Sequence, residues 1–462
     1  MLPTKVVVIG AGSAIFGLNT VSALLGSGRL RGSHLALVDL NAETLELMAR
    51  LARRLNREWD AEMTITAHTH HAEALAGAEF VVSAIEVPPR EKLWQQDYEI
   101  TLKYGVRQPY AENGGPGGFA HAARNILPVL QIAHDMEVAC PDAWFINYTN
   151  PMIRICDAIH RHSAIKVVGL CHQIHVGYGM VGYVLADVLD IEVPEGEISS
   201  HAHPQFWPRL TQLSHQALEK VDIKAAGLNH FTWMLDLRSK ESGEDLYPLF
   251  AERWAAFDPA FEPLTRRVYD AFGLFPIPGD EHLCEYLPWT SDPLTRPWEK
   301  YDLSLYDWEL MDQLRGAQHQ DIAQMAEGKT TIEHLRQANS EGALEMVENV
   351  AGAGNHYHLA VNLPNVGQIA NLPAGAIVET PGLVSGMGVQ GVSVGSLPTG
   401  VAELCRREIA AVRLGVDAAV HGDRELALQC LLLSPCVTDL DVAQQILDDY
   451  LETYREYLPQ FW

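Results

Sequence analysis

The sequence predicts an α/β protein whose N-terminal half is a Rossmann-type, doubly wound parallel sheet. A β-branched run at 6–9 leads into a glycine turn, Gly10-x-Gly12, and a helical pattern follows through Leu25. Short apolar runs then alternate with helical stretches, which is typical of parallel strands joined by helices. From about residue 195 this alternation gives way to a mixed α/β pattern that is rich in helix.

Each further strand of the sheet is expected where an apolar run of strand length lies between helical stretches. The second strand, at 35–38, ends at Asp39, and helix-forming residues follow from 42 to 55. Later strands are expected at 63–66, 79–85, 143–148 and 166–170.

The second half of the chain is expected to combine one clear strand with long helices. The strand-like segment reaches 227–231, and helical stretches cover 305–350 and 402–457. Between 352 and 400 glycines and prolines are frequent, so we expect ordered loops there.

Composition excludes several classes of function. The formal charge of −26, from 33 basic and 59 acidic residues, argues against binding to nucleic acid or to an anionic membrane. No run of about 20 apolar residues could span a membrane, and no signal peptide is recognisable at the N-terminus. The seven cysteines are scattered without a disulfide framework, which is typical of the reducing cytoplasm.

The glycine turn predicts a dinucleotide site. Gly10 and Gly12 let the backbone approach a pyrophosphate at a helix N-terminus. The carboxylate of Asp39 can accept hydrogen bonds from ribose hydroxyls and repels a 2′-phosphate, so NAD is favoured over NADP. Ile15 stands where the third glycine of the motif would fall. A turn that merely packs a helix against a strand is the alternative.

Cys171 and His230 predict a metal site. Cys171 lies at the carboxyl end of a predicted parallel strand, where open α/β sheets bind ligands. A thiolate and an imidazole suit a divalent transition metal, and two protein ligands leave positions open for substrate oxygens. Taken singly, each residue is more often an ordinary buried side chain. Beside a nicotinamide, such a metal indicates oxidation of an alcohol followed by stabilisation of an enolate.

The chain resembles glycoside hydrolase family 4, the NAD- and divalent-metal-dependent glycosidases, nearest the branch of α-galactosidases and α-uronidases. The likeness rests on eight blocks: GAGSAIFG at 10–17, GPGG at 115–118, NYTNP at 147–151, GLCH at 169–172, AGLNHF at 226–231, GDEHLCEYLPW at 279–289, VNLPNVGQIANLP at 361–373 and HGDRELALQ at 421–429. It implies an arrangement like that of lactate and malate dehydrogenases, with an NAD-binding domain at 1–195 and a C-terminal domain for substrate, metal and oligomerisation at 196–462.

The resemblance implies a redox-assisted elimination rather than the usual two-carboxylate scheme. NAD⁺ takes a hydride from carbon 3 of the sugar, and the ketone that forms acidifies the hydrogen on carbon 2. A base removes that hydrogen while a metal, usually Mn²⁺, stabilises the enediolate. The aglycone then leaves, water adds, and NADH returns the hydride, so no net NADH forms.

The family's site residues carry over to several positions. Cys171 and His230 match the metal ligands, Asn150 a residue that contacts substrate, and Asp280 an acid near the metal and its water. Gly10, Gly12, Ser13 and Asp39 match the cofactor site.

The base and the acid stay open. Tyr286 and His282 are rival bases in the 279–289 block, and His172 could protonate the leaving group or bind a sugar hydroxyl. Glu281 and Glu285 of this block are equally compatible with a solvated helical face.

The expected substrate is an unphosphorylated hexoside, an α-galactoside, α-glucoside or α-uronide, because Cys-His after Gly-Leu resembles the non-phosphorylated group. A homodimer or homotetramer is implied by the family. The alternative functions are an NAD-dependent dehydrogenase of a hydroxy acid or sugar, which would accumulate NADH, and a sugar-binding protein without turnover.

Overall fold

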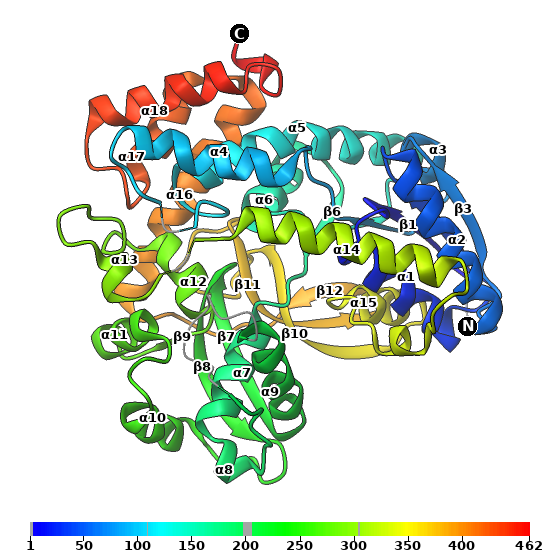
Figure 1. The fold of residues 1–462 in the computed structure, drawn as a ribbon, viewed down its shortest axis with the longest axis horizontal. Helices are drawn as coiled ribbons and strands as arrows, with labels where there is room; N and C mark the ends of the chain where they lie inside the picture. Colours follow the sequence, from blue (N-terminus) through cyan, green and yellow to red (C-terminus); the bar gives the residue numbers. More distant parts are fainter. Residues whose placement is uncertain (1–2, 109, 197–205, 304) are drawn as a thin grey trace.

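A single twelve-stranded sheet connects the described parts of both halves of the chain (Figure 1). The structure is a computed structural model that describes residues 3–108, 110–196, 206–303 and 305–462. Six parallel strands in the order β3-β2-β1-β4-β5-β6 form the N-terminal part of the sheet, which confirms the predicted doubly wound topology. Their bounds are β1 Lys5–Ile9, β2 His34–Val38, β3 Thr64–His68, β4 Phe80–Ser83, β5 Trp144–Asn147 and β6 Lys166–Gly169.

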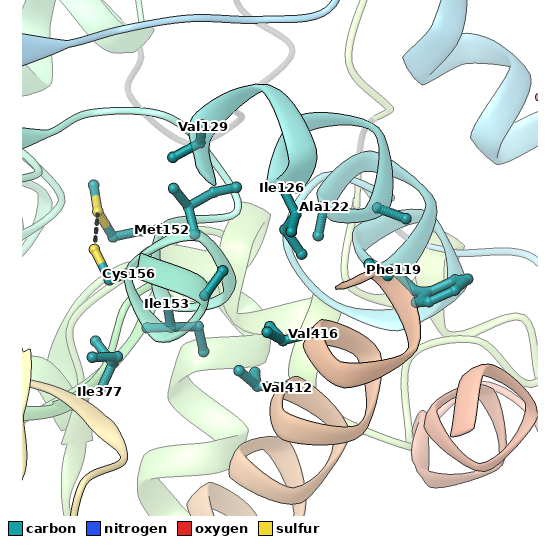
Figure 2. Packing of buried hydrophobic residues seen from close by; sticks show 14 of the residues in the cluster. Phe119, Ala122, Ile126, Val129, Met152, Ile153, Cys156, Ile377, Val412 and Val416 are labelled. Atoms are coloured by element: carbon teal, nitrogen blue, oxygen red, sulfur yellow. Dashed lines mark hydrogen bonds between the residues drawn. The ribbon is translucent and has the colours of Figure 1, made fainter. Parts of the chain in front are cut away.

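Helices cover both faces of this parallel part. Along β1, Val7 and Ile9 belong to one buried layer and Val6 and Val8 to another, as alternation on a strand requires. The first layer contains α5 Gly115–Ala139, α6 Met152–His162 and α16 Thr399–His421, whose side chains meet in Figure 2. The second contains α1 Phe16–Gly26, α2 Ala42–Glu58, α14 Trp308–Ala326 and α15 Ala343–Ala351.

The C-terminal half extends the same sheet with antiparallel strands. The β10 strand joins the edge of β6, with Asn362 opposite Gly169, and the order continues β10-β11-β7-β8-β9 while β12 pairs with β11. These strands are β7 Val221–Leu228, β8 Phe231–Ser239, β9 Phe275–Pro276, β10 Asn355–Pro364, β11 Ile377–Ser385 and β12 Gly388–Gly391. The expectation of loops between 352 and 400 was therefore wrong, because β10, β11 and β12 pair in this range and most of its glycines and prolines lie outside these strands.

The long helical stretches of the second half are present but interrupted. The 402–457 stretch contains α16, α17 Arg424–Leu433 and α18 Leu440–Thr453. Gly422, with φ +68°, ends α16, and the Asp423 side chain then caps α17 by accepting from two backbone amides. The remaining helices are α3 Ala72–Leu75, α4 Arg90–Lys103, α7 Ile174–Val184, α8 Ala186–Leu189, α9 Phe206–Lys220, α10 Tyr247–Ala256, α11 Pro263–Phe272, α12 Gly279–Leu283 and α13 Pro297–Lys300.

Within the described ranges, no helix has the length and apolar character needed to cross a membrane. The domain boundary at residues 195 and 196 stays a prediction.

Candidate active site

The glycine turn lies between β1 and α1, at the carboxyl edge of the parallel strands. Gly10 has φ +83°, a conformation that favours glycine, and the Ser13 amide closes the turn on the Gly10 carbonyl at 3.1 Å. The Gly12 amide donates to Asp39 Oδ2 at 2.8 Å, and Asp39 Oδ1 accepts from the Asn41 amide at 2.8 Å. The predicted ribose-binding carboxylate thus lies beside the turn and also fixes its shape.

Close packing of α1 against this turn depends on Gly17 rather than on a glycine at position 15. A Cβ on Gly17 would overlap the Ala11 carbonyl, whereas Ile15 is 39% exposed. The turn is also contacted from the second half, because His319 Nε2 of α14 lies 3.1 Å from the Gly12 carbonyl oxygen. No local pattern in the sequence predicts His319 there, since only the tertiary fold brings α14 to the turn.

Cys171 and His230 lie together as predicted. Cys171 follows β6, His230 lies between β7 and β8, and their Sγ and Nε2 atoms are 3.3 Å apart. Burial, together with the charges on His282 and His172, lowers the pKa of His230 well below its ordinary value. The ring is therefore neutral, the form that binds metals. Burial raises the pKa of the Cys171 thiol well above its usual range.

This pair fits two ligands of one ion. Sulfur and nitrogen ligands at about 2.3 and 2.1 Å from a metal lie roughly 3.1–3.6 Å apart for coordination angles between a right angle and the tetrahedral angle. The 3.3 Å between Cys171 Sγ and His230 Nε2 falls within that span. Among the described residues, no group of three or more His, Cys, Asp or Glu side chains could hold a metal. Two protein donors would leave coordination positions open to a substrate.

His172 pairs with a carboxylate that the sequence did not reveal. Its Nδ1 lies 2.8 Å from Glu341 Oε1, on the loop before α15, and the His172 side chain is 59% exposed. The charge of Glu341 is the main reason that the pKa of His172 is raised. An exposed imidazole beside Cys171, with its pKa raised by a carboxylate, is suited to giving a proton to a bound molecule.

His282 lies next to the candidate metal pair, stacked on the His230 ring with centroids 4.4 Å apart. Burial lowers the pKa of His282, but the interaction with Glu285 and the charge on Glu281 outweigh burial, so the pKa is raised. Glu285 is buried, so the alternative of a solvated face does not hold for it.

Tyr286 contacts the backbone of His230. Its hydroxyl oxygen accepts from the His230 backbone amide at 3.1 Å, its ring stacks on Phe231, and its side chain is 2% exposed. Burial raises the pKa of Tyr286 well above its ordinary value, which disfavours the phenolate. Of the two rival bases, the geometry favours His282.

Asn150 faces a buried acidic cluster. Its Nδ2 donates to Glu112 Oε1 at 3.3 Å, and Arg90 donates to the same oxygen at 2.9 Å. Asn150 Oδ1 is buried with no partner, so it remains able to accept a hydrogen bond. Glu285 Oε1 accepts from the backbone amides of Glu112 and Asn113 at 2.7 and 3.0 Å, which ties this cluster to the His282 segment.

Asp280 has the contacts of a structural residue. Its two carboxylate oxygens accept from the backbone amides of Leu264 and Thr265, at 2.8 and 2.6 Å, at the start of α11. Its predicted place beside a metal and water stays a prediction.

Replacing Asp280 with asparagine is expected to lower the free energy of unfolding by about 1 kcal/mol while leaving catalysis intact, because the change weakens a helix cap. Urea unfolding and steady-state kinetics would check this. A fall in kcat of tenfold or more in a fully folded variant would instead favour the catalytic role.

Comparison with known protein families identifies the family of this chain. The model described as "Family 4 glycosyl hydrolase" matches residues 5–190, and the one for the C-terminal domain of that family matches residues 225–437. The chain belongs to family 4 of the glycosyl hydrolases. This confirms the resemblance drawn from the sequence blocks.

Family 4 members of similar length match over nearly the whole chain. The α-glucosidase of Erwinia rhapontici is 30% identical and the α-galactosidase of Bacillus subtilis (strain 168) 27% identical, and each alignment covers 99% of both proteins. The crystal structure of the Bacillus subtilis protein lplD superposes with a TM-score of 0.83 at 26% identity, covering 97% of this chain and 100% of lplD. A 6-phospho-α-glucosidase from gut microorganisms, solved with NAD and Mn²⁺, shares the fold with a TM-score of 0.76 at 20% identity, with both chains covered completely.

Proposed function

We propose that this family 4 enzyme hydrolyses an unphosphorylated α-linked hexoside, with NAD and a divalent metal, Mn²⁺ in the first place, as cofactors. The observation that carries the proposal is the Cys171–His230 pair at the carboxyl edge of the sheet that also holds the glycine turn. The names of the relatives, α-glucosidase, α-galactosidase and α-galacturonidase, support α-linked substrates without a phosphate.

When bound, NAD would supply oxidation and re-reduction at carbon 3 of the sugar, and the metal would supply Lewis acidity. Gly10 and Gly12 would admit the pyrophosphate, Ser13 lies in the same turn, and Asp39 would accept from the ribose. Cys171 and His230 would hold the metal.

The remaining candidate residues handle the substrate and its protons. Asn150 offers its free amide oxygen to a sugar hydroxyl. His282 takes the carbon-2 proton, since its ring stacks on the His230 ring beside the candidate metal pair. His172, whose pKa is raised by the charge of Glu341, gives a proton to the departing oxygen. The Tyr286 hydroxyl accepts a hydrogen bond from the His230 backbone amide and so helps to hold this residue in place.

An unphosphorylated sugar also suits the charges at this site. Arg90 is engaged by Glu86, Glu91 and Glu112, so its charge is already compensated. A sugar phosphate bound here would also face the carboxylates of Glu86, Glu91 and Glu112. Repulsion between these like charges would cost electrostatic energy.

The proposal is tested with a panel of aryl α- and β-glycosides, assayed under reducing conditions with NAD⁺ and Mn²⁺ and with each omitted in turn. Aglycone release that requires both, without accumulation of NADH, is expected and would identify the sugar. NADH that accumulates in proportion to substrate, without aglycone release, would instead show a simple dehydrogenase.

Replacing Glu341 with glutamine is expected to shift the pH profile. The change removes the charge that raises the pKa of His172, so the imidazolium loses its proton at a lower pH. Because the acid must be protonated, the basic limb of the kcat profile moves to lower pH. A basic limb that stays in place in Glu341→Gln would contradict the assignment of His172 as acid.

His172→Ala is expected to lower kcat by about a hundredfold.

The cellular setting and the assembly are part of this proposal. All seven cysteines are free, in keeping with a reducing cytoplasm. We propose that the protein forms a homodimer or homotetramer. We also propose that residues 1–195 bind NAD and that residues 196–462 complete the substrate and metal site.

A further inference from the structure

A buried carboxyl group is linked to the segments that carry Cys171 and His230, but it takes no part in the proposed chemistry. This is Glu379 of β11, which is 2% exposed. Its Oε2 atom accepts from Asn229 Nδ2 and from Asn362 Nδ2, both at 2.8 Å. The three side chains therefore form a fully buried network of one carboxyl and two amides.

The Asn229 arm of the network reaches the segment that carries His230. Asn229 immediately precedes His230, so fixing its side chain also fixes the backbone from which the imidazole projects. One amide group therefore connects Glu379 to the residue that carries the imidazole nitrogen.

The Asn362 arm reaches the other segment. Asn362 of β10 lies opposite Gly169 in the sheet, and its Nδ2 also donates to the Gly169 carbonyl at 3.4 Å. Gly169 ends β6 two residues before Cys171. On the β11 side, Glu379 is paired with Asn362 and with Gly227 of β7. The carboxyl group thus lies where the strands that lead to Cys171 and to His230 are joined.

This network is costly as a purely structural device. The amide oxygens Asn229 Oδ1 and Asn362 Oδ1 are buried with no partner, and an unsatisfied buried acceptor costs about 1–3 kcal/mol. Apolar side chains of similar volume would fill the same space without that cost. Metal-binding side chains, in contrast, are regularly oriented by hydrogen-bonded partners behind them.

We propose that Glu379 is a positioning residue that, through Asn229 and Asn362, holds the Cys171 sulfur and the His230 imidazole at the separation a divalent metal requires. The inference rests on the proposed function, because it takes these two residues as the metal ligands. It concerns the affinity of the site for metal rather than a step of the reaction.

The test measures Mn²⁺ affinity of the full-length, metal-stripped protein by electron paramagnetic resonance of free Mn²⁺, alongside urea unfolding. Glu379→Ala is expected to weaken Mn²⁺ binding by about 10- to 100-fold. Glu379→Gln is expected to stay within about threefold of the parent, because burial raises the pKa of Glu379 to about 7 and glutamine keeps an acceptor oxygen.

A matched control separates positioning from stability. Asp97 of α4 is another buried carboxylate, and it pairs with Arg124 of α5. Asp97→Asn is expected to lower the free energy of unfolding without changing Mn²⁺ affinity. Should Glu379→Ala fail to fold, Asn229→Ala, which removes the amide that joins Glu379 to the residue before His230, is expected to give the same loss of affinity.

The outcomes distinguish this inference from the proposed function. Unchanged Mn²⁺ affinity in folded Glu379→Ala or Asn229→Ala, while Cys171→Ser loses affinity, would overturn the positioning role and leave the metal site intact. A parent protein that binds no Mn²⁺ would overturn both. Weakened binding in Glu379→Ala that Glu379→Gln restores would establish the positioning role.

Discussion

Replacing Cys171 with serine is expected to reduce glycosidase activity by at least about a thousandfold. The change takes the thiolate from a two-residue donor set, so little is left to hold a metal whose Lewis acidity contributes several kcal/mol to the reaction. The measurement is kcat/KM on the best aryl glycoside of the panel, over a range of Mn²⁺ concentrations.

Cys436→Ser is the matched control, because Cys436 is also a free, partly buried thiol but lies next to Ser434 in the segment between α17 and α18. Its activity is expected to equal that of the parent. Full activity in Cys171→Ser would refute the metal assignment, and with it the central part of the proposed function.

Gly10→Ala is expected to weaken NAD⁺ binding by more than about a hundredfold. Gly10 has φ +83°, where an L side chain is strained, and its Cβ would overlap the main-chain carbonyl of Ala84 after β4. Strain and overlap together exceed about 3 kcal/mol, and the turn must shift to relieve them. Isothermal titration calorimetry with NAD⁺ measures the effect.

Gly28→Ala provides the comparison for this prediction. A Cβ on Gly28 would meet nothing within 4 Å, and the residue lies in the same half of the protein. Its NAD⁺ affinity is expected to be unchanged. Equal affinities of Gly10→Ala and the parent would show that the cofactor, if bound, does not use this turn.

The parallel half of the fold was predictable because its signals are local. Each strand is a short apolar run, and Gly10 marks the turn by a conformation that other residues avoid. Strands β10 and β11 were missed because the glycines and prolines of the 352–400 range, most of which lie outside the strands, indicate loops. The two strands pair mainly with each other, and one residue pair each joins them to β6 and β7, which only the tertiary fold brings close.

The residues of the candidate site likewise fall into those that the sequence predicted and those that it did not. Cys171 and His230 could be found because each lies in a specific block, and the fold brings their side chains to 3.3 Å. Glu341 and Glu379 could not be found, since a single carboxylate in a loop or strand carries no local signal of its partner. His172 and Glu341 are 169 residues apart in the chain. The structure also distinguishes Tyr286 from His282, the two rival bases, of which the sequence favoured Tyr286.

The junction between β6 and β10 has a mechanical consequence. Since β10 adds directly to the edge of the parallel strands, a fragment ending near residue 195 would leave β6 as a bare edge strand, open to pairing with another chain. The two halves are therefore expected to refold as one cooperative unit, and separately expressed halves to aggregate. For the same reason, a hinge opening of one half against the other would have to break the pairing of β10 with β6.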